Sequence, residues 1–436
     1  MNIVYIHTHD TGRMISPYGY PAETPFLQEF AEDAITFRNM HCVCPTCSPS
    51  RSALLTGRYP HNNGMLGLAH MKFALHDYKE HLSARLRERG YRTVLCGVQH
   101  ETSDLDHLSY DRILTKGIAG YDQIGFRNWD QRNAELAAEF VHGYREERPF
   151  FLSFGMVNTH RPYLEDEKND ERYLRPPLHM PDNAENRRDF AQFLSGVRVV
   201  DNCFGILLKA LKERGFYENS LILFTTDHGI AYPHMKCNLT DWGTGVAFLL
   251  RVPDGGKGIV CDQMLSQLDF LPTLYEYMGW EPLNSFQGKS FANLLRQNPD
   301  DRAPVHEEIF GEVTFHAAYQ PMRSVREERY HYILHFDDGK VIPVNIDAGI
   351  AKDFVLRYGF SDMPPCREFL FDLMLDPCEK VNLANETSHE KVKERLRKKL
   401  FDHMRATDDL LLIGVEGIHG KPIWNRSGNG MDERFL

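Results

Sequence analysis

The sequence lacks the features that would place a protein in or across a membrane. It contains no run of about 18 apolar residues, so it predicts no membrane-spanning helix. Its first residues lack the basic segment, the apolar stretch and the small-residue cleavage site of a secretory signal. Nine cysteines scattered over 436 residues do not suggest a disulfide framework. Together these absences predict a cytoplasmic protein with no membrane partner.

An excess of basic residues is also missing. The chain has 50 Lys and Arg against 61 Asp and Glu, which gives a net charge of −11. Because a phosphate backbone requires a basic face, this balance argues against nucleic acid as a partner. The negative net charge argues more weakly against a protein surface that wraps a long sulfated polymer. A small anionic substrate that enters a local basic pocket is compatible with it.

Short apolar runs that end in polar residues recur over the first 230 or so residues of the chain. They lie at residues 2–6, 92–97, 149–155 and 220–226, with helix-like segments at 80–89 and 190–214 between them. This alternation predicts an α/β fold with a mainly parallel sheet flanked by helices. Ligands bind beyond the carboxyl ends of the strands in such sheets, so the polar residues that follow these strands are the first candidates for an active site.

The pattern changes after a polar, proline-containing connector at residues 298–304. Residues 330–336 and 368–373 are typical of strands, and residues 390–407 of an amphipathic helix that covers them. We therefore predict a catalytic domain at residues 1–300. A smaller α+β subdomain, with an antiparallel sheet and a helix, is predicted at residues 305–436.

The densest group of reactive residue types is the segment CSPSRSALLTGR at residues 47–58. Ser48 can cap a helix, Pro49 fits its first turn, and Gly57 can end it. Cys47 is therefore predicted at a helix N-terminus, where free N–H groups and the helix dipole favour an anion. Arg51 lies one turn further and can reach back to the same spot.

Two simpler interpretations of Cys47 stay open at this point. It can be a buried structural cysteine before an ordinary helix. It can also bind a metal together with Cys42 and Cys44, although the sequence offers no second cysteine or histidine pair with the spacing of a zinc site.

The pattern Cys-x-Pro-Ser-Arg followed by Leu-Thr-Gly-Arg resembles the motif of the formylglycine-dependent sulfatases of the alkaline phosphatase superfamily. The resemblance implies an alkaline-phosphatase/sulfatase-like fold and the conversion of Cys47 to formylglycine by a separate maturation enzyme. In that family the aldehyde hydrates, and one hydroxyl attacks sulfur and expels the alcohol or amine. The second hydroxyl then loses its proton and sulfate is released, which divides one difficult step into two.

The same resemblance implies one bound divalent metal. Its ligands would be His9 and Asp10 after the first strand, Asp227 and His228 after a late strand, and the converted Cys47. Most sulfatases carry two acids at the first pair and Asp-Asn at the second, so this chain departs at both. Imidazole ligands favour manganese or a similar ion over calcium, which stays open. The alternative for His9 is an ordinary polar residue at a strand end.

Further site residues follow from the resemblance. His100 matches the histidine that takes the proton from the formylglycine hydroxyl, and His160 matches a histidine near the leaving group that can act as general acid. Lys236 matches a basic residue that contacts the sulfate, beside Arg51. Val98 stands where many sulfatases carry a lysine. Gln99, which follows it, could only partly substitute.

Several stretches bear on the substrate. Residues 61–68, 237–239 and 321–326 resemble the N-sulfoglucosamine sulfohydrolases (heparan N-sulfatases) within the family. His316, Tyr319 and Arg323 are candidates for the mouth of the pocket, with ordinary packing between subdomains as the alternative.

We therefore expect a sulfatase that acts on a small sulfated saccharide, with N-sulfoglucosamine as one candidate. A homo-oligomer is left open. A second hypothesis is a phosphonate monoester or phosphodiester hydrolase, since enzymes of that kind carry the same Asp-His pair as Asp227 and His228. A third hypothesis is a non-catalytic binding protein. It is suggested by Val98, which stands where many sulfatases carry a lysine of the sulfate-binding site.

Overall fold

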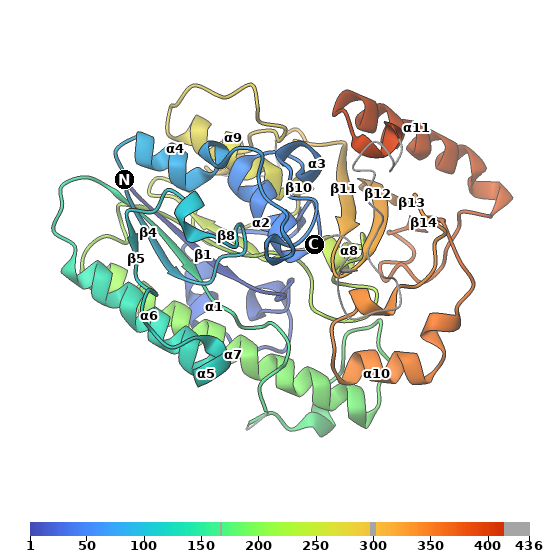
Figure 1. Cartoon of the computed structure of the whole chain (residues 1–436), viewed down its shortest axis with the longest axis horizontal. Helices are drawn as coiled ribbons and strands as arrows, with labels where there is room; N and C mark the ends of the chain where they lie inside the picture. Colours follow the sequence, from blue (N-terminus) through green and yellow to red (C-terminus); the bar gives the residue numbers. More distant parts are fainter. Residues whose placement is uncertain (166–167, 297–301, 414–436) are drawn as a thin grey trace.

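The centre of the protein is an eight-stranded sheet (Figure 1). The structure is a computed structural model that describes residues 1–165, 168–296 and 302–413. In spatial order the strands are β5 (Arg112–Ile113), β4 (Arg92–Gly97), β6 (Phe150–Gly155), β1 (Asn2–Thr8), β7 (Ser220–Thr226), β8 (Phe248–Arg251), β2 (Ile35–Phe37) and β9 (Ile259–Cys261). Every neighbouring pair is parallel except those of β8, which runs antiparallel to β7 and β2. The predicted α/β class with a mainly parallel sheet is confirmed.

The register of the central strands brings their carboxyl ends to one line. His7 of β1 lies opposite Gly155 at the end of β6, and Thr8 lies opposite Thr226 at the end of β7. Gly97 at the end of β4 also pairs with Gly155. The polar segments that follow these four strands therefore start side by side, as expected for a parallel sheet.

Helices cover both faces of the sheet (Figure 1). Alternate residues of β1 divide between two apolar layers: Val4 and Ile6 face one, and Ile3 and Tyr5 face the other. The first layer is closed by α1 (Pro25–Ala31), α6 (Phe126–Gly143) and α7 (Ala184–Glu213). The second is closed by α2 (Cys47–Thr56), α4 (Leu82–Glu88) and α9 (Phe270–Tyr277).

The helix predicted at residues 190–214 begins six residues earlier in the structure. Asn183 caps α7, because its side chain accepts a hydrogen bond from the backbone N–H of Asn186. The prediction followed the apolar spacing, whereas the polar first turn of the helix is fixed by this cap.

The C-terminal part forms a four-stranded antiparallel sheet with the order β11 (Glu308–Phe315), β12 (Tyr319–Glu327), β13 (Tyr330–His335) and β14 (Glu368–Asp372). Helix α11 (Glu390–Ala406) packs on it, and α10 (Ile350–Arg357) lies beside α7. The predicted subdomain architecture is confirmed, but the first two strands were not predicted. They carry buried charged residues such as Glu312 and Arg323, which break the apolar alternation of a strand. Residues 298–301 of the predicted connector lie outside the described residues, and the domain boundary stays a prediction.

Shorter elements complete the described chain. They are α3 (Pro60–Asn63), α5 (Tyr121–Ile124), α8 (Asp241–Thr244) and a two-stranded pair of β3 (Met40–His41) and β10 (Leu265–Ser266). Among the helices that the structure describes, none is long and apolar enough to cross a bilayer. None of the nine cysteines, all of which lie in the described part of the chain, is paired in a disulfide.

Candidate active site

Cys47 is the first residue of α2 and is buried. The residue at the cap position is Thr46, in an extended conformation, and Gly57 ends the helix with a φ of +69°. The prediction that Ser48 caps the helix is wrong. Its hydroxyl lies inside the first turn and accepts a hydrogen bond from the backbone N–H of Ala69 at 3.0 Å. The predicted place of Cys47 at a helix N-terminus is nevertheless correct.

The predicted metal ligands meet at Cys47. Ligating atoms of His9, Asp10, Cys47 and Asp227 all lie within 4.8 Å of one another, and all four residues are buried. His228 adjoins them, with its Nε2 3.4 Å from Asp10 Oδ1 and 3.6 Å from Cys47 Sγ. The strand-end cluster, as we call these five residues, is built by β1 and β7 on one side and by α2 on the other.

Several polar atoms of the strand-end cluster have no hydrogen-bond partner in the described part of the chain. They are both ring nitrogens of His9 and Oδ1 of Asp10, although His9 Nδ1 lies 3.2 Å from Asp227 Oδ2. Buried polar atoms without partners are costly, and native proteins avoid them unless a ligand or ion completes the site. Asp10 also has a φ of +51°, which is uncommon outside glycine. This set of imidazole, carboxylate and sulfur donors fits a divalent cation.

Arg51 is fixed against the same cluster. Its Nη2 donates to Thr8 O at 2.7 Å and to Asp227 Oδ2 at 2.9 Å, and its Nη1 contacts His7 Nδ1. Burial would raise the pKa of Asp227, but His228, Arg51 and His9 hold that pKa well below its ordinary value. The carboxylate is therefore ionised, as a metal ligand must be.

Two predicted histidines flank His9. The ring centroids of His9 and His100 are 4.4 Å apart, and those of His9 and His160 are 5.5 Å apart. His100 also lies with Cys47 and His9 in one group of ligating atoms within 4.8 Å. Burial lowers the pKa of His100 well below its ordinary value, which leaves the imidazole neutral at neutral pH. Nδ1 of His160 is bound to Arg161 O at 2.5 Å, so Nε2 is the nitrogen left for a ligand.

Lys236 joins the cluster to a carboxylate that the sequence did not point to. Its Nζ donates to Asp10 Oδ2 at 2.9 Å and to Asp347 Oδ2 at 2.8 Å. Burial would lower the pKa of Lys236, but Asp10 and Asp347 raise it well above its ordinary value, so the ammonium stays charged. Asp347 follows no strand of the large sheet and belongs to no recognised motif. No sequence signal that we used could have found it.

Residues 1–280 match the sequence model of the family described as Sulfatase. The chain belongs to the sulfatase family. An ulvan-active sulfatase of Formosa agariphila is 26% identical over 98% of this chain and 78% of its own length. The N-sulphoglucosamine sulphohydrolase of Homo sapiens is 26% identical over 91% of this chain and 88% of its own length. A solved structure described as a 2-O GAG sulfatase shares the fold, with a TM-score of 0.72, 19% identity and coverage of 100% of this chain and 99% of its own.

The sulfatase lacks the lysine that many members carry two residues before His100. Val98, in its place, packs in an apolar cluster with Trp129 and Val157. The side chain of Gln99 is occupied by its own turn: Nε2 donates to Thr102 O at 2.9 Å, and Oε1 accepts from Thr102 N at 3.0 Å. The structure therefore does not support Gln99 as a substitute for the lysine. Lys236 does bring an ammonium group to the cluster, where it contacts Asp10.

The three residues predicted for the pocket mouth lie in different surroundings. Arg323 does not line the site, because its Nε and Nη2 bind Asp409 at 2.5 and 3.0 Å inside the subdomain interface. Tyr319 packs on Phe315 in an apolar cluster at that interface. His316 is buried, which lowers its pKa to about 3, and it is within electrostatic range of Asp347 and Lys236.

The zinc alternative for the cysteines is not supported. Within the described residues, the groups that could hold a metal include Cys47 but neither Cys42 nor Cys44. Cys44 Sγ lies 3.1 Å from Thr46 Oγ1, and Cys42 is part of an apolar cluster.

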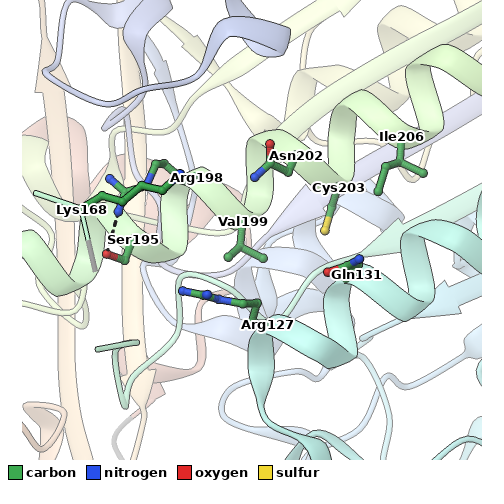
Figure 2. A pocket seen from close by; sticks show the side chains of 9 residues that line it. All are labelled: Arg127, Gln131, Lys168, Ser195, Arg198, Val199, Asn202, Cys203 and Ile206. Atoms are coloured by element: carbon green, nitrogen blue, oxygen red, sulfur yellow. Dashed lines mark hydrogen bonds between the residues drawn. The ribbon is translucent and has the colours of Figure 1, made fainter. Parts of the chain in front are cut away.

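A hollow of about 300 Å³ lies elsewhere, between α6 and α7 (Figure 2). Its lining contains no residue predicted for the active site and consists of Arg127, Gln131, Lys168, Ser195, Arg198, Val199, Asn202, Cys203 and Ile206. Arg198 Nη2 donates to Ser195 Oγ at 3.0 Å across this lining. The strand-end cluster, and not this hollow, is therefore the candidate active site of the sulfatase.

Proposed function

We propose that this sulfatase hydrolyses the sulfate ester or sulfamate of a small sulfated sugar, with N-sulfoglucosamine as the first candidate. The observation that carries the proposal is the burial of Cys47 at a helix N-terminus beside two carboxylates and two imidazoles. The names of the relatives support a saccharide substrate, since they include an ulvan-active sulfatase and an N-sulphoglucosamine sulphohydrolase.

We propose that one divalent cation is held by His9, Asp10, Asp227, His228 and the converted Cys47. Such an ion neutralises charge on the sulfate oxygens when it is bound. The unpartnered nitrogens of His9 and the unpartnered Oδ1 of Asp10 support this assignment. The imidazole donors favour manganese or a similar ion over calcium. Metal exchange after chelation tests the preference, and full activity with calcium but none with manganese would contradict it.

Position 47 would supply the nucleophile after conversion of the thiol to formylglycine by a maturation enzyme. His100 adjoins Cys47 and is neutral, so it is placed to accept the proton of the attacking hydroxyl. His160 would give a proton to the leaving oxygen or nitrogen from Nε2 when both ring nitrogens are protonated, because its Nδ1–H already donates to the carbonyl oxygen of Arg161. Arg51 and Lys236 would orient the sulfate by charge-assisted hydrogen bonds.

Mass spectrometry and a substrate panel test the proposal. Conversion of Cys47 to formylglycine lowers the residue mass by about 18 Da, which a peptide digest resolves. We expect the matured protein to hydrolyse N-sulfoglucosamine or a related sugar sulfate. An unmodified thiol in fully active protein would rule out the formylglycine mechanism. An unmodified thiol in protein that binds sulfated sugars without turning them over would favour the non-catalytic alternative.

The phosphonate hydrolase remains the second candidate, because the pair Asp227 and His228 favours it. Comparison of an aryl sulfate with an aryl phosphonate monoester separates the two functions. A large preference for the phosphonate would replace the first proposal.

The cytoplasmic location and a homo-oligomeric state also remain proposals. Nine cysteines without a disulfide among them are compatible with a reducing compartment. Fractionation of the source cells tests the location, and light scattering of the purified protein tests the oligomeric state.

A further inference from the structure

Asp347 reaches the active site from the C-terminal subdomain. It lies between β13 and β14, shortly before α10, and ligating atoms of Asp10, His160 and Asp347 lie within 4.8 Å of one another. The side chain of Asp347 keeps 13% of its surface exposed, whereas that of Asp10 keeps 0%. A ligand that enters the site can therefore touch Asp347, while Asp10 is enclosed.

The segment that carries Asp347 is held on both sides. Asn345 donates a hydrogen bond to Gln320 Oε1 at 2.9 Å, which ties the segment to β12. Gly349 packs so closely on the loop after β6 that a Cβ there would lie 2.2 Å from Arg161 Nη1. The carboxylate is thus placed by its surroundings before any ligand binds, which is what a recognition group requires.

A carboxylate repels a sulfate group, so the position of Asp347 needs another explanation. Lys236 stands between Asp10 and Asp347, since its Nζ donates to both. Asp10 belongs to the proposed cation site, and Asp347 is joined to it through Lys236. His160, the proposed general acid, has a ring nitrogen within 4.8 Å of both carboxylates. The part of the substrate beside His160 is the leaving group. A carboxylate there complements hydrogen-bond donors such as an amine or a hydroxyl.

We propose that Asp347 is a specificity-determining residue that binds the amine and hydroxyl donors of the sugar beside the scissile bond. This inference rests on the proposed function, because it concerns the leaving group of the same reaction. When a sulfamate is hydrolysed, the S–N bond breaks, water supplies the fourth sulfate oxygen, and the nitrogen leaves as a protonated amine. That cation pairs with the carboxylate of Asp347, whereas the phenol released from an aryl sulfate offers no comparable charge.

The kinetic test compares Asp347→Asn with the control Asp353→Asn, which removes an exposed carboxylate of α10. Values of kcat/KM are measured for N-sulfoglucosamine and for nitrophenyl sulfate with matured enzyme. We expect Asp347→Asn to lower the value for the sugar by about 10- to 100-fold more than the value for the aryl ester. The control should leave the ratio of the two values unchanged. Equal losses on both substrates would overturn the inference, because they would show that Asp347 only holds Lys236.

Binding of glucosamine separates this inference from the proposed function, because it requires neither turnover nor conversion of Cys47. Titration calorimetry should show binding about 10-fold weaker in Asp347→Asn and in Asp347→Ala, and unchanged in Asp353→Asn. Thermal unfolding verifies that each variant is folded. A folded Asp347→Asn protein that binds glucosamine as tightly as the wild type would overturn the inference. Binding that depends on Asp347 in a protein inactive on every sulfate would support the inference and refute the proposed function.

Discussion

Two buried groups of histidines and carboxylates differ in how their polar atoms are satisfied. One is the strand-end cluster, in which three buried atoms of His9 and Asp10 have no hydrogen-bond partner among the described residues. The other lies where the C-terminal sheet meets the large domain. This interface cluster consists of His61, Glu312, Arg323 and Asp409.

In the interface cluster, the guanidinium of an arginine pairs with a buried carboxylate. Arg323 binds both oxygens of Asp409, at 2.5 and 3.0 Å. Both oxygens of Glu312 are engaged by His61: its backbone N–H donates to Oε1 at 2.9 Å, and its Nδ1 contacts Oε2. Among the buried atoms of the described interface cluster, only Nε2 of His61 lacks a partner.

The comparison teaches that the same residue types can serve binding or packing. Where a fixed cation of the protein already pairs with a carboxylate, as Arg323 does with Asp409, the protein itself supplies the positive charge, and the group holds the C-terminal sheet against α3. Where buried donors and acceptors stay unsatisfied, the fold bears a cost that a ligand can offset. The following predictions test this difference.

Cys47→Ala should have the largest effect on activity. Without the nucleophile we expect turnover to fall by at least about 10⁴-fold, because covalent catalysis is lost. Urea denaturation should show almost unchanged stability. Cys44→Ala, in a buried thiol outside the cluster, is the control and should retain turnover. Substantial activity in Cys47→Ala would refute the proposed chemistry.

Asp409→Asn should have the largest effect on stability. It leaves Arg323 buried without its anion, which typically costs about 3–5 kcal/mol of unfolding free energy. The measurement is urea denaturation, with kcat determined on the protein that remains folded. We expect kcat to be unchanged. A loss below about 1 kcal/mol would mean that Glu312 or water takes over the pairing.

His100→Gln should separate catalysis from stability in the strand-end cluster. Loss of a proton acceptor lowers kcat/KM by about 10²- to 10⁴-fold. The control is His81→Ala, because buried His81 accepts a hydrogen bond from the backbone N–H of Ser83 and starts α4. That variant should lose about 1 kcal/mol of stability and keep its kcat/KM. The opposite pattern would assign His100 a structural role.

Metal removal should affect the two clusters differently. A cation at 100 times its Kd adds about 2.7 kcal/mol to the unfolding free energy. Chelation should therefore lower the melting temperature of the wild type and of Asp409→Asn alike. Asp10→Asn should lose this response, since asparagine tolerates the positive φ but removes a charged ligand. A chelation response that persists in Asp10→Asn would place the cation elsewhere.

The smallest expected effect concerns pH. Burial would raise the pKa of Asp409, but Arg323 lowers it below its ordinary value of 3.8. A carboxyl whose pKa is lower in the folded state stabilises the protein above its unfolded pKa and loses that contribution on acidification. The stability difference between wild type and Asp409→Asn should therefore be full near neutral pH and shrink below about pH 4. A difference that grows on acidification would contradict the assignment.

Much of the site could be predicted from the sequence because it follows strand ends. His9, Asp10, Asp227 and His228 come directly after β1 and β7, which lie side by side in register. Cys47 was predictable because helix signals and a long motif coincide there. Parallel strands necessarily bring their carboxyl ends together, so local patterns were sufficient to predict these contacts.

Other features depended on segments that meet only in the folded chain. Asp347 lies in an irregular connection 111 residues from Lys236, and no local pattern marks it. Arg323 was assigned to the pocket mouth, although its partner Asp409 lies 86 residues away. The strands β11 and β12 were missed because buried ion pairs replace their apolar alternation.

The sequence by itself determined the layered α/β architecture, the helix that begins at Cys47 and the family of the protein. Periodicity, caps and motifs are local properties of the chain, and they suffice for these conclusions. Only the tertiary structure decided which carboxylate meets which cation. A hydrogen bond or an ion pair acts over a few ångströms, and the folded chain alone sets such distances between residues far apart in sequence.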